Sequence, residues 1–353
     1  MDIFFYTGRG LPPFISNSSF KALQLALPHF YSNQEIFDKI SLPEYVGIQD
    51  SLSYLTIRDI MNPRCHVLGG AKPDSITVGI PNNQKITIEE YMSFVNKSKV
   101  DIAPSLSEEA SLSCGNHRSK RSAKNAIVML DSCLELKSPA LKLLGNIQGG
   151  KDMESREFCA KEMKKRCVDG FVIGGIDLEE SGAQLRRVVG AVYNGLSGDS
   201  RMIVLSGPGR PLDIVYAAQH GITFFESCWP FILAEKGKAL DLPLVNFEDA
   251  ENIEDMDFYE PELDLNDEKF AMQKGALVEN CECLTCKQHH RGYIYHLLRV
   301  KEMGGNTLLA IHNSFVMKKL VEKLAKAKEE GKLGSVYADF VNKYCMGSFS
   351  TIN

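Results

Sequence analysis

From about residue 118, short apolar runs alternate with longer amphipathic stretches. The short runs have the length and composition of buried strands, and the amphipathic stretches have apolar residues at helical spacing. We predict helices at 118–136, 153–166, 179–192 and 212–219, and strands at 141–147, 170–173, 202–205 and 222–225. Strands that alternate with helices in this way are typical of parallel βαβ units, and four in a row favour a (β/α)8 barrel or a doubly wound sheet.

The first 115 residues show no comparable order. Short apolar stretches alternate with turn residues such as Gly8-Arg9-Gly10 and Pro81-Asn82-Asn83. This pattern predicts strands and loops, with one helix near residues 88–95.

The last third of the chain contains an acidic stretch and a lysine-rich helix. Residues 241–268 include twelve Asp and Glu residues, which we interpret as a solvated connector; a surface for a basic partner is the alternative. Residues 314–330 predict a helix with an apolar inner side. Its lysines are interpreted as a solvated face, with phosphate contact as the alternative; they are Lys318, Lys319, Lys323, Lys326 and Lys328.

Composition limits the class of protein. The chain has 353 residues, 44% of them hydrophobic, which is enough for one large barrel or two smaller domains. The net charge of −5 provides no global field that attracts nucleic acid. Ten scattered or clustered cysteines in a chain of this length indicate a reducing compartment rather than a disulfide scaffold. We find no apolar run long enough for a membrane span and expect no signal peptide.

Three cysteines lie within six residues, at Cys281, Cys283 and Cys286. Zinc takes four thiolate or imidazole ligands in a tetrahedron, so this run supplies three of them. The alternative is three reduced thiols in a loop. Apolar residues between Gly292 and Gly304 have helical spacing, and residues 306–311 could return the chain to the metal. Spacing leaves four candidates for the fourth ligand: His289, His290, His296 and His312.

The cysteine run, the stretch Arg291–Leu298 and the pair His312-Asn313 together resemble the zinc region of the tRNA-guanine transglycosylases. The resemblance implies that His312 is the fourth zinc ligand. It also implies an α/β fold, an irregular (β/α)8 TIM barrel with an inserted zinc-binding subdomain near the C-terminus. We expect a barrel at 1–265 with the acidic connector at 241–265. The zinc-binding subdomain would follow at 266–312, and a helix that completes the barrel at 313–353.

The same resemblance assigns roles at the mouth of the barrel, where strands end. Gln148, Gly174 and Gly175 match residues that line the family's base pocket. Glu226 falls at the position of the aspartate nucleophile that attacks the ribose during exchange of guanine for a queuine-type base.

Four departures from the family pattern fall in this mouth. Glu226 is one methylene longer than aspartate, and Ser107 replaces a base-recognising aspartate, so a two-oxygen acceptor is lost. The family's Asp-Ser-Gly-Gly-Phe-Gln loop has only a trace at 50–55, and its Pro-Thr-Arg is Pro230-Phe231-Ile232. We therefore expect that Glu226, Ser107, Gln148, Gly174 and Gly175 are vestigial and that the chain alone is not an enzyme.

These departures resemble the accessory, non-catalytic branch of the eukaryotic queuine tRNA-ribosyltransferases. The resemblance implies a heterodimer with a catalytic subunit, one structural Zn²⁺, and tRNA bound through the complex; a homodimer of the isolated chain is left open. Two alternatives are a divergent active transglycosylase with Glu226 as nucleophile, and an unrelated zinc-dependent hydrolase. The expected location is the cytoplasm, with peripheral association at the mitochondrial outer membrane implied by the family alone.

Overall fold

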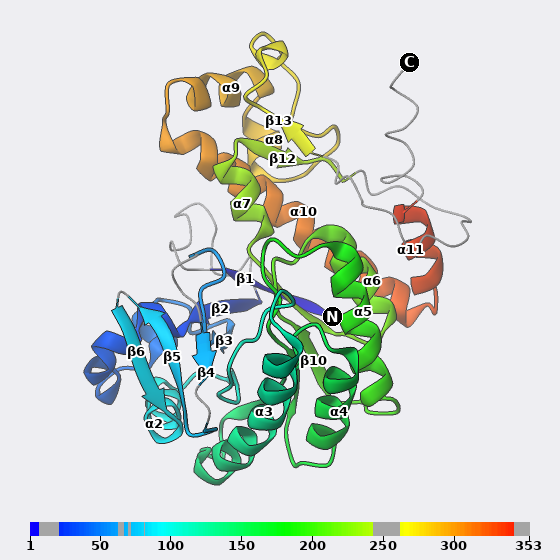
Figure 1. Cartoon of the computed structure of the whole chain (residues 1–353). Coiled ribbons are helices and arrows are strands. Elements are labelled where there is room, and N and C mark those ends of the chain that lie inside the picture. Colours follow the sequence, from blue (N-terminus) through cyan, green and yellow to red (C-terminus); the bar gives the residue numbers. More distant parts are fainter. Residues whose placement is uncertain (7–20, 63–66, 70–71, 81, 243–261, 342–353) are drawn as a thin grey trace.

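The centre of the molecule is a closed barrel of eight parallel strands (Figure 1). The computed structural model describes residues 1–6, 21–62, 67–69, 72–80, 82–242 and 262–341. The barrel strands are β1 (Asp2–Tyr6), β2 (Ala22–Ala26), β3 (Leu52–Thr56), β7 (Ile102–Pro104), β8 (Lys142–Ile147), β9 (Gly170–Ile173), β10 (Met202–Leu205) and β11 (Phe224–Ser227). The last strand, β11, pairs in parallel with β1, so Phe4 lies opposite Glu226. This closure confirms the predicted barrel and excludes the doubly wound sheet.

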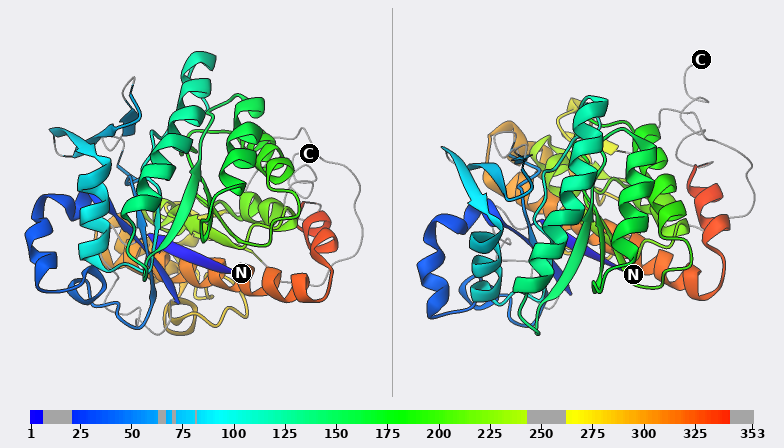
Figure 2. Two further views of the ribbon diagram at one scale, coloured as in Figure 1. Left: turned by 90° about the horizontal axis from the view of Figure 1, so that it is seen from below. Right: turned by 60° about the horizontal axis from the view of Figure 1, so that its bottom comes forward.

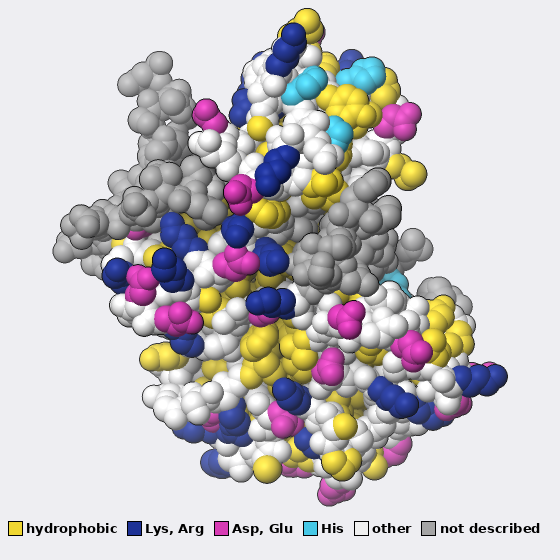
Figure 3. Space-filling model, turned by 180° about the vertical axis from the view of Figure 1, so that it is seen from behind, with side chains coloured by type: hydrophobic (Ala, Val, Ile, Leu, Met, Phe, Trp, Pro, Cys, Tyr) yellow, Lys and Arg dark blue, Asp and Glu magenta, His cyan; other side chains and the backbone are white. Residues whose placement is uncertain are grey.

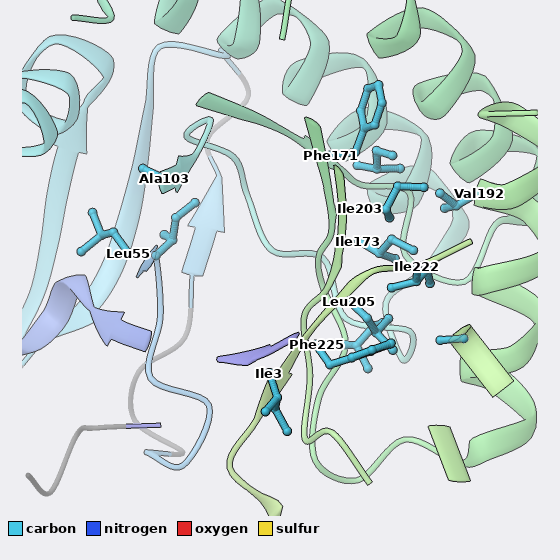
Figure 4. Close-up of a cluster of buried hydrophobic side chains, with 14 of the residues drawn as sticks. Ile3, Leu55, Ala103, Phe171, Ile173, Val192, Ile203, Leu205, Ile222 and Phe225 are labelled. Carbon is cyan, nitrogen blue, oxygen red and sulfur yellow. The ribbon is translucent and has the colours of Figure 1, made fainter. Parts of the chain in front are cut away.

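Apolar side chains pack on both sides of the barrel wall because successive residues of a strand point to opposite faces. One cluster draws a residue from each barrel strand: Phe4, Ala22, Tyr54, Ile102, Leu144, Val172 and Val204, with Phe224 partly buried. Their neighbours along the strands belong to the main core between strands and helices (Figure 4), which includes Ile3, Leu55, Phe171, Leu205 and Phe225. The wall is therefore apolar on both faces, as in other barrels of this class.

Helices surround the barrel between successive strands (Figure 2). They are α2 (Ile88–Ser98), α3 (Asn116–Leu136), α4 (Met153–Lys164), α5 (Gly182–Gly195), α6 (Pro211–Gln219) and α7 (Trp229–Glu235). A capping box begins both α2 and α5, with Thr87 paired to Glu90 and Ser181 paired to Gln184. The elements predicted between residues 118 and 225 are all present, with bounds shifted by three residues or fewer.

The first 115 residues supply half of the barrel, which the sequence pattern did not reveal. Four barrel strands lie there, each three to five residues long. Between them the chain forms η2 (Leu27–His29), η3 (Tyr31–Asp38) and α1 (Leu42–Tyr45), and a three-stranded antiparallel sheet of β4 (Val67–Gly69), β5 (Ser75–Ile80) and β6 (Asn82–Thr87). The predicted helix near 88–95 corresponds to α2, and the predicted turn at Gly8–Gly10 lies outside the described residues.

The metal subdomain follows the barrel strands in the chain. It contains β12 (Lys238–Leu240), which pairs with β13 (Glu262–Asp264), then η4 (Glu268–Phe270), α8 (Leu284–Gln288) and α9 (Arg291–Arg299). Most of the predicted acidic connector lies outside the described residues, which resume at 262. A second, smaller core inside this subdomain includes Leu265, Phe270, Leu277, Ile294 and Leu309.

One long helix, α10 (Met303–Glu329), joins the metal subdomain to the barrel and is followed by α11 (Leu333–Val341) (Figure 1). The predicted helix at 314–330 therefore begins eleven residues too late, and the predicted limit at residue 312 falls inside α10. Apolar residues continue at helical spacing through Leu308, Leu309 and Ile311, and nothing in 306–311 breaks the helix. Within the described ranges, no helix combines the length and the apolar character that crossing a bilayer requires.

Candidate metal centre and the mouth of the barrel

Four potential metal ligands meet where α8 and α10 approach each other. Cys281 and Cys283 precede α8, Cys286 lies within it, and His312 is a buried residue of α10. The Nδ1 atom of His312 lies 3.7 Å from the Sγ of Cys281 and 3.4 Å from the Sγ atoms of Cys283 and Cys286. All four donor atoms lie within 4.8 Å of one another, so the group could hold a metal ion.

Hydrogen bonds around the cluster orient the donors. Cys283 caps α8 because its Sγ accepts from the backbone N–H of Cys286 at 3.3 Å. The Nε2 of His312 lies 2.8 Å from the carbonyl oxygen of Leu240, so a proton on Nε2 leaves Nδ1 facing the thiols. Asn313 accepts from the Leu240 N–H at 2.8 Å and donates to the carbonyl of Pro230 at 3.1 Å. The His-Asn pair therefore ties α10 to β12 and to the start of α7.

The geometry of the cluster fits a tetrahedral ion. Zinc–sulfur bonds of about 2.3 Å and zinc–nitrogen bonds of about 2.0 Å place sulfur and nitrogen about 3.5 Å apart in a tetrahedron. The observed separations match this value. Burial lowers the pKa of His312, but hydrogen bonds to the thiols of Cys281 and Cys286 outweigh it and raise that pKa to about 9. A cation that binds these donors therefore displaces protons.

Spacing alone left four histidines as candidates for the fourth ligand, and the structure places one of them, His312, beside the three cysteines. His290 caps α9 by accepting from the N–H of Tyr293 at 3.0 Å, and His289 stacks on the Tyr293 ring. Neither His289, His290 nor His296 belongs to the group of donors around the three cysteines. His312 does belong to it, as the family resemblance implies.

Glu226 lies on β11 at the mouth of the barrel and is buried. Its carboxylate accepts from the hydroxyl of Ser206 at 2.8 Å and from the hydroxyl of Tyr54. Burial raises the pKa of Glu226 to about 7, against the opposing effect of these hydrogen bonds and of Arg58. The carboxylate at the nucleophile position is thus surrounded by the chain's own donors.

The residues that the resemblance assigns to a base pocket bind one another. The amide of Gln148 donates to Asn146 at 2.8 Å and accepts from the N–H of Ala110 at 3.2 Å. A side chain at Gly174 would collide with Asn146 and Gln148, so these groups pack directly on the backbone there. Gly175 has a φ of +72°, which favours glycine. The Ser107 hydroxyl is fully buried and has no hydrogen-bond partner among the described residues.

Two charged residues of the mouth were missed by the sequence analysis. Glu109, two residues after Ser107, accepts from the Gly175 N–H at 3.0 Å and from the Asn146 amide at 3.2 Å. Arg58 lies two residues after β3, and its Nε is 3.0 Å from Glu109. The same loop therefore carries a carboxylate, at Glu109, although Ser107 itself supplies none. Arg58 lies two residues after β3 and Glu109 five residues after β7, and charged residues in the loops that follow barrel strands were the signal that could have identified both.

The stretch at 50–55 also differs from its sequence interpretation. Residues 52–55 belong to β3, and Asp50 and Ser51 precede that strand. They therefore lie toward the opposite end of the barrel from the mouth. The residues that follow β3 at the mouth are Ile57, Arg58 and Asp59.

Little open space remains in the mouth. The cavity there has a volume of about 10 Å³ and is lined by residues from several strands and loops, among them Tyr54, Arg58, Glu109, Asn146, Ser206 and Glu226. That volume has room for about one water molecule, whereas pockets for small ligands measure about 300–1,000 Å³.

Glu226→Gln is expected to reduce the loss of stability that accompanies rising pH. The folded chain holds the Glu226 proton up to a pKa of about 7, above the ordinary value of 4.5. Stability therefore falls as pH rises through that window, by on the order of 2 kcal/mol for this group. Urea unfolding of the parent chain and of Glu226→Gln, near pH 5 and near pH 8, measures how much each free energy of unfolding falls between the two pH values. The variant should still lose some stability between these pH values, because burial also raises the pKa of Glu180 to about 7. An equal loss of stability in the parent and in Glu226→Gln would contradict the prediction.

Residues 54–346 match the sequence model of the queuine tRNA-ribosyltransferase family. The queuine tRNA-ribosyltransferase accessory subunit 2 of Xenopus laevis is 27% identical over 350 residues, 87% of this chain and 84% of that protein. The Homo sapiens protein of the same name is 27% identical over 352 residues, 87% of this chain and 84% of its own length. A queuine tRNA-ribosyltransferase of Methylacidiphilum infernorum is 29% identical over 208 residues, 59% of this chain and 49% of its own length.

The family match spans the barrel from β3 onward and includes the cysteine cluster and His312. It agrees with the resemblance that these residues carry and with the closed parallel barrel. This chain belongs to the queuine tRNA-ribosyltransferase family.

Proposed function

We propose that this chain is a non-catalytic subunit of a heterodimeric tRNA-guanine transglycosylase, which exchanges guanine for queuine at the wobble position of the tRNA anticodon. The observation that carries the proposal is the filled mouth. Glu226 is buried under Ser206 and Tyr54, and the cavity beside it has room for about one water molecule. A ribose and a base have no access to that carboxylate in this arrangement. The names of the relatives from Xenopus laevis and Homo sapiens support an accessory role.

We further propose that the metal is a single structural zinc ion. Three thiolates and one imidazole are a donor set that zinc prefers, and four protein ligands leave no open position for a water. Zinc bound there would hold the start of α8 against α10. The closed donor set argues against the alternative of a zinc-dependent hydrolase.

The metal subdomain offers a surface for the catalytic partner. Met272 and Met303 are 90% and 84% exposed, and Val300 is 52% exposed. Hydrophobic and histidine side chains gather over this subdomain at the top of Figure 3. Exposed apolar side chains of this kind mark protein–protein contacts, so we place the catalytic chain on this face.

For tRNA, the proposal relies on α3 more than on the lysines of α10. On α10, Lys319 pairs with Glu322 at 2.9 Å, and Lys326 lies 3.9 Å from Glu330, which favours the solvated face. The first part of α3 carries four basic residues before its first acidic residue: Arg118, Lys120, Arg121 and Lys124. Arg118 and Arg121 pair with the buried Glu108, so the exposed Lys120 and Lys124 are the ones we propose for phosphates. Such a local run could contact phosphates in the complex although the chain is acidic overall.

The subcellular location remains a proposal. The described cysteines outside the metal cluster are free thiols, which suits a reducing compartment, and we therefore propose the cytoplasm. Association with the mitochondrial outer membrane rests on the family resemblance alone.

The test is exchange of labelled guanine into tRNA by this chain, by a catalytic queuine tRNA-ribosyltransferase chain of the same organism, and by both together. We expect at least about 100-fold less exchange by this chain alone than by the mixture, because its carboxylate is out of reach of the ribose. In the mixture, Glu226→Gln should retain exchange, since the carboxylate performs no step.

Two results would contradict the proposal. One is rapid exchange by the isolated chain, and the other is a covalent tRNA adduct that disappears in Glu226→Gln. Either would favour the alternative of a divergent transglycosylase with Glu226 as nucleophile.

A further inference from the structure

The guanidinium of Arg58 fills the mouth of the barrel. Its Nε lies 3.0 Å from Glu109, its Nη1 donates to the Asp177 carboxylate, and its Nη2 donates to the carbonyl of Ile176 at 2.5 Å. Only 12% of the side chain is exposed. The partners come from the loops after β7 and β9, while Arg58 comes from the loop after β3. One guanidinium therefore joins three loops of the mouth.

The acceptor that receives Arg58 is held in place by other groups. Glu109 is nearly buried, and its two carboxylate oxygens also accept from Asn146 on β8 and from the backbone of Gly175. Neutral donors alone would leave a buried negative charge uncompensated, which is costly. The carboxylate thus has a fixed orientation and requires a cation or a strong N–H donor in front of it.

The shape of the site matches a planar donor. A guanidinium is flat and presents several N–H groups in a fixed fork, and the acceptors around Arg58 lie at different edges of that fork. Above its pKa of about 7, the Glu226 carboxylate adds negative charge from β11. Lysine would supply charge without the planar arrangement of donors.

We propose that the mouth is a recognition site for a planar guanidinium-type donor, and that Arg58 is its built-in ligand, which closes the site in cis. This inference rests on the proposed non-catalytic function, because Arg58 can occupy the mouth permanently only if no external base has to bind there. The alternative interpretation is that Arg58 and Glu109 form an ordinary structural ion pair. Such a pair would also stabilise the fold, but removal of the arginine would leave no preformed site for a free ligand. Binding of an external guanidinium separates these two interpretations.

The experiment removes Arg58 and supplies its head group in solution. Arg58→Ala, Arg201→Ala and the unchanged chain are heated in about 20 mM guanidinium chloride or in sodium chloride of equal ionic strength, at a concentration well below the denaturing range. Arg201 is the matched control, because it also pairs with a nearly buried carboxylate, Asp199, but precedes β10 at the other end of the barrel.

We expect guanidinium to raise the Tm of Arg58→Ala by about 2 °C relative to sodium chloride, and to leave the other two proteins unchanged. Ethylguanidinium, which also replaces the two missing methylenes, should bind about tenfold more tightly than guanidinium in a calorimetric titration. Equal responses of Arg58→Ala and Arg201→Ala would overturn the proposal.

A second pair of variants keeps the test valid if Arg58→Ala does not fold. Arg58→Gln retains most of the side-chain volume and should bind guanidinium measurably, although more weakly because its amide partly fills the site. The double variant Arg58→Ala/Glu109→Ala removes both charges and should bind neither ligand. The proposal would be wrong if the double variant bound guanidinium, or if none of the folded Arg58 variants bound it. None of these measurements uses tRNA or the catalytic chain, so their failure is distinct from failure of the exchange assay.

Discussion

Cys283→Ser is expected to release the metal subdomain from α10 and to abolish stable metal binding. Cys283 contributes a buried thiol to the donor cluster and also caps α8, so a single change removes both. Binding of a structural zinc ion by a small domain supplies on the order of 10 kcal/mol of local folding free energy. The small core around Phe270 and Leu309 has few residues with which to replace that contribution. We therefore expect residues from about 265 to 315 to loosen.

Limited proteolysis and metal content measure this effect. The variant should bind well under one zinc ion per chain and should be cut within residues 265–315 at protease concentrations that leave the parent intact. Association with the catalytic chain should weaken, because the exposed Met272 belongs to this subdomain and the exposed Met303 begins the adjoining α10. Cys167→Ser is the matched control, since Cys167 is an exposed thiol outside the cluster. Unchanged protease resistance between 265 and 315 in Cys283→Ser would refute the structural role of the metal.

Arg156→Met is expected to destabilise the chain by about 3–5 kcal/mol, because the loss of a buried donor leaves its carbonyl acceptors unpaired at about 1–3 kcal/mol each. Arg156 is completely buried on α4. Its Nε donates to the carbonyl of Gly150 at 3.0 Å, and its Nη1 donates to the carbonyls of Ile147 and Gly174 at 3.0 and 2.7 Å. Methionine fills similar space but leaves three carbonyls at the ends of β8 and β9 without this donor.

Urea unfolding of Arg156→Met tests this role. Arg187→Met, an exposed position on α5, is the control and should change stability by less than about 0.5 kcal/mol. If the two variants lost equal stability, the buried guanidinium would have no special part in holding the mouth. A second readout is hydrogen exchange of the backbone near Gln148 and Gly174, which should become faster in Arg156→Met only.

Some of the contacts described above could be predicted from the sequence, and others could not. The cysteine run and the His312-Asn313 pair were recognisable because metal ligands must be close in space, and three of the four are also close in the chain. The regular half of the barrel was recognisable because each βα unit repeats the same local pattern. Glu226, Gln148 and the glycine pair could be placed at the mouth because they follow or end those strands.

The βα units after residue 118, the metal-binding motif and the family were predictable from the sequence, because each depends on residues that are neighbours in the chain. The closure of β11 on β1, the continuation of α10 through His312 and the contacts of Arg58 with Glu109 and Asp177 became apparent in the folded chain. Short strands carry almost no pattern of their own, and Arg58 is separated from Asp177 by 119 residues. An ion pair between such distant residues is created by barrel closure, which brings the ends of all strands to one mouth.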